Sequence, residues 1–225
     1  MIRLGDWRTV LADVEPDAVI TDPPYSERTH DGSDAGRREG ARSLRALQYD
    51  AWTPDDVAEF VSSWAPRTRR WICALTSHDL VPAWEAGLAD AGWWSAPPVP
   101  VLLPVRPRLS GGGPNLGPVH LVVGRPRSHE AAAWRTTAAW YDCSQQRHGS
   151  AVVGAKPLGL MGAIVRDYSE PGDLVCDPCA GGGTTLLAAL EFGRRAIGAE
   201  VDAERYEIAA RALARPVQAD LFGGG

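Results

Sequence analysis

Short apolar runs that stop at proline or glycine recur along the chain and predict buried strands. Residues 18–21 lead into Asp22-Pro23-Pro24-Tyr25, and residues 173–176 lead into a glycine-rich stretch. Runs of four to six apolar residues that end in this way are typical of parallel strands covered on both faces. Further runs of this kind stand at 2–4, 70–75, 119–124 and 195–200.

Apolar residues at helical spacing separate these runs. Thr53 and Pro54 form a start signal, a capping residue followed by proline, and Val57, Phe60 and Trp64 follow on one face. Further helices are predicted at 78–91, 156–168, 184–192 and 202–214, with one helical turn at 7–11. Strands that alternate with helices favour an α/β fold, in which 99–105 and 119–124 form an antiparallel hairpin.

Several stretches show neither the apolar runs typical of strands nor the apolar spacing typical of helices. Residues 26–50 are polar and rich in Gly, Asp and Arg, and they predict a long loop. Residues 125–155 show little pattern apart from 130–141. No repeat and no second domain is evident, so we expect a single domain over 1–225.

Composition narrows the class of protein. The chain has 225 residues, of which 44% are hydrophobic and 23% charged, as in ordinary globular proteins. No apolar stretch reaches the roughly 18–20 residues that span a bilayer. Residues 1–10 lack the apolar core of a signal peptide. We therefore expect a cytoplasmic protein with no membrane partner.

Charge is unevenly distributed. The net charge of −5 argues against a nucleic-acid partner, but residues 101–150 hold six arginines against Glu130 and Asp142, a local charge of +4. Such a patch either follows a phosphate backbone or is a solvated surface. The arginines are Arg106, Arg108, Arg125, Arg127, Arg135 and Arg147.

Cysteine and lysine are both sparse. Cys176 and Cys179 form a lone C-x-x-C with no second ligand pair, so we expect packing or loop residues and no metal site. Lys156 is the single lysine among 23 basic residues. A lysine alone among arginines indicates a need for a compact point charge.

The glycine-rich stretch predicts a ligand loop. Gly181-Gly182-Gly183 lies between a strand and a helix that begins near Thr184, so backbone N–H groups point at one spot. The stretch lacks the Gly-Lys-Ser/Thr ending of a nucleotide-hydrolysing loop. Glu200 ends the next strand, where an acid accepts hydrogen bonds from ribose hydroxyls. The alternatives are a plain turn and a surface acid; together the two features favour a nucleoside-containing cofactor.

The other motif predicts a site for an amino group. Two prolines stiffen the loop after Asp22 and leave the Asp22 carboxylate and the Pro23 carbonyl as acceptors. Tyr25 offers a flat face on which a base can stack. The alternative is a rigid turn without function.

The chain resembles the amino-group DNA methyltransferases in three stretches, namely Lys156-Pro157, Ser169 to Thr185, and Arg194 to Asp202. Its target motif precedes these stretches, as in the permuted β-class order. The resemblance implies a Rossmann-like sheet of about seven strands, with one antiparallel hairpin strand and helices on both faces. It also implies S-adenosylmethionine as the cofactor.

Site residues carry over position by position. The resemblance places catalysis at Asp22, Pro23, Pro24 and Tyr25. It places cofactor binding at Asp6, Lys156, Asp177, Pro178, Cys179, Gly181, Gly183, Thr184, Glu200 and Asp202. Asp6 is then beside the adenine, Glu200 on the ribose, and Lys156-Pro157 beside the methionine carboxylate. The chain departs from the family pattern at Cys179, where Phe is usual, at Gly182, where Ser is common, and at 152–155.

An Asp-led motif in this family goes mostly with adenine N6, so we expect methylation of a flipped adenine in double-stranded DNA. Target recognition is expected within 125–155, with the loop 26–50. Cytosine N4 in DNA, an RNA amine, and a catalytically silent nucleic-acid-binding relic remain alternatives, and a homodimer is left open.

Overall fold

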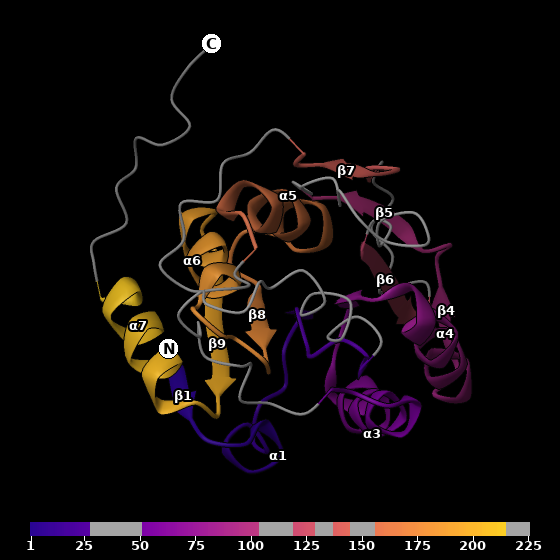
Figure 1. Ribbon diagram of the computed structural model, residues 1–225, viewed down its shortest axis with the longest axis horizontal. Coiled ribbons are helices and arrows are strands. Elements are labelled where there is room, and N and C mark those ends of the chain that lie inside the picture. Colours follow the sequence, from indigo (N-terminus) through magenta and orange to yellow (C-terminus); the bar gives the residue numbers. More distant parts are fainter. Residues whose placement is uncertain (28–50, 104–118, 129–136, 145–155, 215–225) are drawn as a thin grey trace, which may run out of the picture.

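A computed structural model describes residues 1–27, 51–103, 119–128, 137–144 and 156–214. Within these ranges the strands form one sheet of nine members with helices on both faces (Figure 1). The strands are β1 (Ile2–Leu4), β2 (Ala18–Thr21), β3 (Trp71–Thr76), β4 (Trp93–Ser95), β5 (Val99–Leu102), β6 (Val119–Pro126), β7 (Tyr141–Asp142), β8 (Leu174–Asp177) and β9 (Arg195–Glu200).

The helices fall where the apolar spacing predicts them. They are α1 (Trp7–Val10), α3 (Pro54–Trp64), α4 (Val81–Asp90), α5 (Leu158–Tyr168), α6 (Thr184–Glu191) and α7 (Ala203–Leu213). Thr53 and Asp56 form a reciprocal capping box at the start of α3, as the Thr-Pro signal indicates. The predicted helix 78–91 is divided: residues His78–Leu80 form a 3-10 turn before α4. None of the described helices is long and apolar enough to cross a membrane.

The sheet is parallel except at one strand. Its order is β1-β9-β8-β2-β3-β6-β5-β7, and β6 runs antiparallel to β3, β4 and β5. This confirms the α/β class and the hairpin between β5 and β6. The expected number of about seven strands is too low for the described sheet, because β4 and β7 have only three and two residues. Strands this short show no alternation in the sequence.

Strands β2 and β8 are direct neighbours, with Ala18 opposite Val175 and Val19 opposite Cys176. From β2 the chain passes through α3 to β3 on one side, and from β8 it passes through α6 to β9 on the other. The order therefore reverses between β2 and β8. A crevice at the carboxyl ends of two such strands is where open α/β sheets bind ligands.

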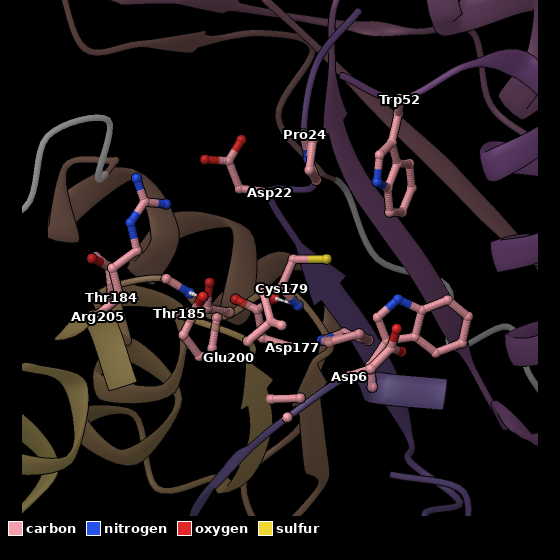
Figure 2. A pocket seen from close by; sticks show the side chains of 18 of the residues that line it. Asp6, Asp22, Pro24, Trp52, Asp177, Cys179, Thr184, Thr185, Glu200 and Arg205 are labelled. Atoms are coloured by element: carbon pink, nitrogen blue, oxygen red, sulfur yellow. Dashed lines mark hydrogen bonds between the residues drawn. The ribbon is translucent and has the colours of Figure 1, made fainter. Parts of the chain in front are cut away.

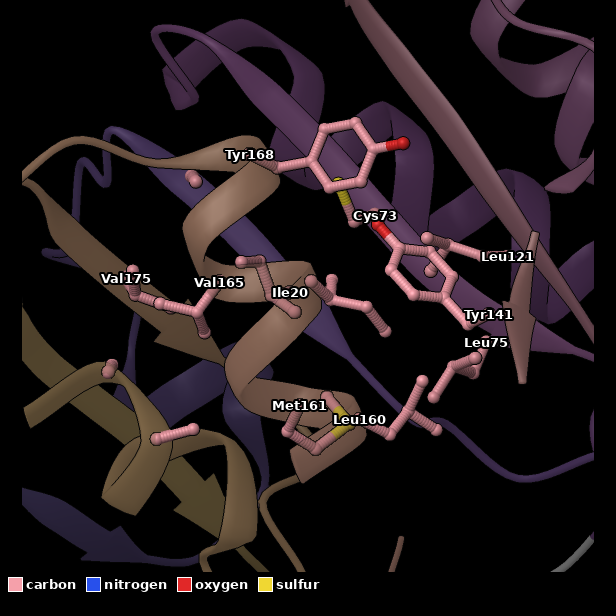
Figure 3. Packing of buried hydrophobic residues seen from close by; sticks show 14 of the residues in the cluster. Ile20, Cys73, Leu75, Leu121, Tyr141, Leu160, Met161, Val165, Tyr168 and Val175 are labelled. Carbon is pink, nitrogen blue, oxygen red and sulfur yellow. The ribbon is translucent and has the colours of Figure 1, made fainter. Parts of the chain in front are cut away.

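Alternate residues of the central strands enter two separate cores. Ile20, Cys73 and Leu75 pack on α5 and α6, as Figure 3 shows for α5. Val19 and Ile72 face the other way, into a core built with α1, α3 and α4. Burial on both faces explains why these strands read as continuous apolar runs.

Candidate active site

A cavity of about 420 Å³ opens at the carboxyl ends of β2, β8 and β9. Its lining residues come from five separate parts of the chain, within 5–8, 22–24, 51–56, 156–161 and 177–205 (Figure 2). In this view Asp22 lies above Asp177 and Glu200, with Trp52 and Asp6 toward one end and Arg205 toward the other. The structure thus brings the two motifs, far apart in sequence, to one cavity.

Gly181 and Gly183, in the loop after β8, have different structural roles. Gly181 has φ +52°, and nothing lies within 4 Å of the place where a Cβ would stand, so the backbone is open to the cavity. Gly183 has φ +81°, and its Cβ would come within 3.0 Å of Ala209 Cβ on α7. Gly183 therefore allows α7 to pack on the loop and does not line the cavity, whereas Gly181 and Gly182 do.

Glu200 is fixed by the backbone at the end of β9. Its Oε2 accepts the Gly181 N–H at 2.8 Å, and its Oε1 accepts the Asp202 N–H at 2.8 Å. The residue is 7% exposed and lines the cavity. Each carboxylate oxygen can accept a second hydrogen bond, so Glu200 is held ready for two ligand hydroxyls.

Asp177 is buried where β8 meets β2. Its Oδ1 accepts the Thr21 hydroxyl at 2.8 Å and the Cys179 N–H at 3.1 Å. Burial raises the pKa of Asp177 to about 6, which these bonds only partly oppose. The carboxylate ties the two strands together beneath the cavity.

The Asp22 carboxylate is engaged on both oxygens. Lys156 Nζ donates to Oδ2 at 2.5 Å, and the Tyr25 hydroxyl donates to Oδ1 at 2.9 Å. The Lys156 ammonium also lies 5.0 Å from the centre of the Tyr25 ring. The expectation of a free acceptor at Asp22 is therefore wrong for this structure. Pro24 lines the cavity beside Asp22, and Pro23 and Tyr25 do not.

Asp6 and the residue after it form one end of the cavity. The Asp6 carboxylate caps α1 by accepting the Arg8 N–H at 2.8 Å, and it pairs with the Arg8 guanidinium at 3.2 Å. Arg8 is held in turn by two bonds of 2.6 Å to Glu59 on α3. The buried Trp7 brings an aromatic ring to the cavity.

Sequence reasoning missed several lining residues, Trp7, Trp52 and Arg205 among them. The backbone N–H of Trp52 donates to the Tyr25 carbonyl at 3.1 Å. The Trp52 indole ring lies 6.3 Å from the Trp84 ring in a stacked arrangement. The only signal for Trp52 is its place just before the Thr53-Pro54 helix start. Arg205 follows the α7 cap by three residues, and no sequence pattern marks it.

Of the other residues expected to bind the cofactor, three line the cavity and one does not. Pro178, Cys179 and Thr184 line the cavity. Asp202 does not, because its carboxylate caps α7 by accepting the Arg205 N–H at 2.8 Å. The expectation that Asp202 faces the cofactor is therefore corrected to a structural role.

Two of the six expected DNA-contacting arginines are described, and both lie away from the cavity. Arg125 follows Gly124, which is opposite Ile72 near the start of β3, whereas Thr21 is level with Ala74. Arg125 Cζ lies 4.7 Å from the centre of the Trp94 ring, and Arg127 follows beyond the end of β6. Arg106, Arg108, Arg135 and Arg147 lie outside the described residues, as do 28–50.

Comparison with known families finds similarity to DNA methyltransferases. Residues 123–211 match the DNA methylase family of N6/N4 methyltransferases. The type II methyltransferase M.HindIII of Haemophilus influenzae is 27% identical over 199 residues, 80% of this chain and 61% of that protein. The DNA adenine methyltransferase YhdJ of Escherichia coli is 41% identical over 58 residues, 26% of this chain and 20% of that protein. The aligned residues thus span less than two thirds of each of these relatives.

Solved structures extend the likeness to nearly the whole chain. The crystal structure of M1.HpyAVI superposes with a TM-score of 0.67 at 19% identity, covering 96% of this chain and 99% of that one. The cytosine-N4-specific PvuII DNA methyltransferase superposes with a TM-score of 0.64 at 15% identity, covering 93% and 84%. Residues 123–211 are thus similar in sequence to the N6/N4 DNA methylase family, and nearly the whole chain is similar in fold to solved DNA methyltransferases.

Proposed function

We propose that the protein is an S-adenosylmethionine-dependent DNA methyltransferase that methylates N6 of a flipped adenine. The observation that carries this proposal is the meeting of Asp22 with Gly181 and Glu200 in one cavity, on strands that are neighbours or next neighbours. One motif offers acceptors for an amine, and the other suits a nucleoside cofactor. A single cavity for both is what direct transfer between two substrates requires.

The residues present fit the cofactor. Glu200 offers two oriented carboxylate oxygens to a ribose, and the open backbone at Gly181 admits a close approach. Trp7 and Asp6 provide an apolar ring and an acceptor at the end where an adenine would lie. When bound, the cofactor supplies an electrophilic methyl group on a sulfonium. The names of similar proteins support this cofactor, since one solved relative is a complex of M1.HpyAVI with SAM.

Asp22 would act on the amine of the target base. An exocyclic amine is a poor nucleophile because its lone pair is delocalised into the ring. The Asp22 carboxylate and the Pro23 carbonyl would accept hydrogen bonds from its two N–H groups, favour a pyramidal nitrogen and stabilise the positive charge that develops on it. Once the N–C bond has formed, the methylated nitrogen would release one of its two protons to Asp22 or to water. The transfer is then a single displacement with no covalent enzyme intermediate. The Tyr25 ring would stack on the base.

The choice of adenine rests on the Asp-led motif. The adenine-specific YhdJ is among the similar sequences, and the cytosine-N4-specific PvuII enzyme is among the similar folds. Cytosine N4 is therefore the second candidate, since the fold and the cavity serve either amine. Double-stranded DNA is the proposed partner, and 1–225 the proposed single domain.

The test is transfer of a tritiated methyl group to duplex DNA, followed by digestion and separation of the nucleosides. We expect label in N6-methyldeoxyadenosine and none after Asp22→Ala, which should still bind the cofactor. Label in N4-methyldeoxycytidine would replace the adenine assignment. Cofactor binding without any transfer to DNA or RNA would identify a silent relic.

A further inference from the structure

The ion pair between Lys156 and Asp22 occupies the atoms that the proposed reaction needs. The two side chains are 10% and 23% exposed, so the pair is largely sheltered from water. Lys156 Nζ holds Oδ2 of Asp22 while the Tyr25 hydroxyl holds Oδ1. No carboxylate oxygen of Asp22 is left without a donor.

Lys156 and a target amine therefore compete for one acceptor. Both are small nitrogen groups that donate more than one N–H. A cation that stayed on Asp22 would also oppose the positive charge that develops on the amine during methyl transfer. Transfer is therefore favoured when Lys156 has left Asp22.

The cavity limits where the ammonium can go. Lys156 lines it together with the carboxylates of Asp6, Asp56, Asp177 and Glu200, each of which already accepts hydrogen bonds within the protein. Asp6 also pairs with Arg8, and Glu200 is oriented by two backbone N–H groups. The carboxylate at the amino-acid end of the cofactor is a further anion that the proposed function brings to this cavity.

We propose that Lys156 is a positioning residue that exchanges Asp22 for the cofactor carboxylate, so that binding of the cofactor frees Asp22 for the target amine. This inference rests on the proposed function. It also explains why residue 156 is a lysine. A compact ammonium on a flexible side chain can pass between two carboxylates, whereas the planar guanidinium of an arginine is suited to one bidentate partner. The other 22 basic residues of the chain are arginines.

A single-residue signal tests the exchange without turnover. Lys156 is the one lysine of the chain, so lysine labelled with ¹³C at Cε gives one NMR signal when the tag is lysine-free. S-adenosylhomocysteine carries the amino-acid carboxylate, and 5′-methylthioadenosine is the same nucleoside thioether without it. We expect the signal to move with S-adenosylhomocysteine and to stay in place with 5′-methylthioadenosine. Asp22→Asn should move it without any ligand.

Calorimetry supplies the second readout. Wild-type protein should bind S-adenosylhomocysteine more tightly than 5′-methylthioadenosine by roughly tenfold or more, as for a hydrogen-bonded charge pair. Lys156→Met should lose most of this discrimination, and Lys156→Arg should recover only part of it. Arg211→Met, on a side chain that is 79% exposed, is the control for loss of one positive charge and should keep the discrimination.

The outcomes distinguish failure of the exchange from failure of the proposed function. Failure of the wild-type protein to bind either nucleoside would overturn the proposed function itself. Binding of both with an unmoved lysine signal, or discrimination that survives Lys156→Met, would overturn the exchange and leave the proposed function standing. Discrimination that disappears with Arg205→Met but not with Lys156→Met would assign the carboxylate to Arg205 and also overturn it.

Discussion

At the scale of single residues, the site contains a buried carboxylate whose charge lowers the stability of the folded protein. Burial raises the pKa of Asp177 to about 6 from an ordinary value of 3.8. Between about pH 4 and pH 6 the folded protein holds a proton that the unfolded chain has released. Stability therefore falls as pH rises through this window, and the full cost remains above it.

Asp177→Asn should stabilise the ligand-free protein at pH 8 by about 2–3 kcal/mol, because the amide removes the buried charge. The Asn carbonyl can still accept from Thr21 and Cys179. Urea unfolding at pH 8 and below pH 4 measures the difference, which should disappear at the lower pH. Asp90→Asn on the surface of α4 should change neither value. A variant less stable at pH 8 would show that the hydrogen bonds outweigh burial.

Tyr25 has a ring and a hydroxyl with separable roles. Tyr25→Phe keeps the ring but removes the bond to Asp22 Oδ1, so we expect single-turnover methylation to slow by about tenfold, equivalent to a bond to a charged group. Tyr25→Ala loses the stacking surface as well and should weaken DNA binding further. A Phe variant with wild-type turnover would show that Asp22 needs no orientation by the hydroxyl.

At the scale of elements, β8 and β9 approach closely beneath the cavity. Gly198 is opposite Asp177, and its Cβ would stand 2.7 Å from the Asp177 carbonyl oxygen and 3.0 Å from Leu186. Gly198→Ala should destabilise the fold by about 1–3 kcal/mol and weaken cofactor binding, because the strands must part.

Gly92→Ala is the matched comparison for Gly198→Ala. Gly92 has φ +74° and empty space around the added Cβ, so about 1 kcal/mol of conformational cost should appear in thermal unfolding without any effect on the cavity. Equal effects of both variants on cofactor binding would contradict a steric origin at Gly198.

The elements themselves were largely predictable from sequence. Strands such as β2 and β9 are short apolar runs between clear stop signals, and the start of α3 is marked by its cap. The strand β7 was not predictable, because two residues carry no period and its pairing with β5 joins distant parts of the chain. Element type is a local property, whereas the edges of the sheet depend on tertiary pairing.

At the scale of the whole molecule, the two ends of the parallel strands have different surroundings. The cavity lies at the carboxyl edge, while Arg125 is level with Trp71 at the other end of β3, roughly 13 Å away along the strand direction from the level of Asp22. Arg125 is occupied with Trp94 and with the Pro126 carbonyl.

DNA affinity should fall with salt in this protein if it follows phosphates. The pair of substitutions Arg125→Gln and Arg127→Gln should leave the slope of log affinity against log salt unchanged within about one unit, since both side chains lie at the far edge. Filter binding of duplex DNA over a range of salt measures the slope. A decrease of about two would show that DNA also reaches this edge.

The candidate site was predictable in its members but not in its contacts. Strand ends and glycines identify Asp22, Gly181 and Glu200 because parallel strands end at one edge. The bond from Lys156 to Asp22 spans 134 positions in the chain, and no local pattern marks it. The role of Asp202 as a helix cap was visible in principle, since an Asp before a helix is a common cap.

The hydrogen bond from the Trp52 N–H to the Tyr25 carbonyl has a consequence for how this protein can diversify. It joins the chain that follows Asp22 to the chain that leads into α3, and the Trp52 ring in turn stacks on the buried Trp84. Because closely packed side chains transmit small displacements to their neighbours, the two segments cannot shift independently. Substitutions in the core around Trp84 can therefore change the position of the acceptor at Asp22 without replacing any residue of the site itself.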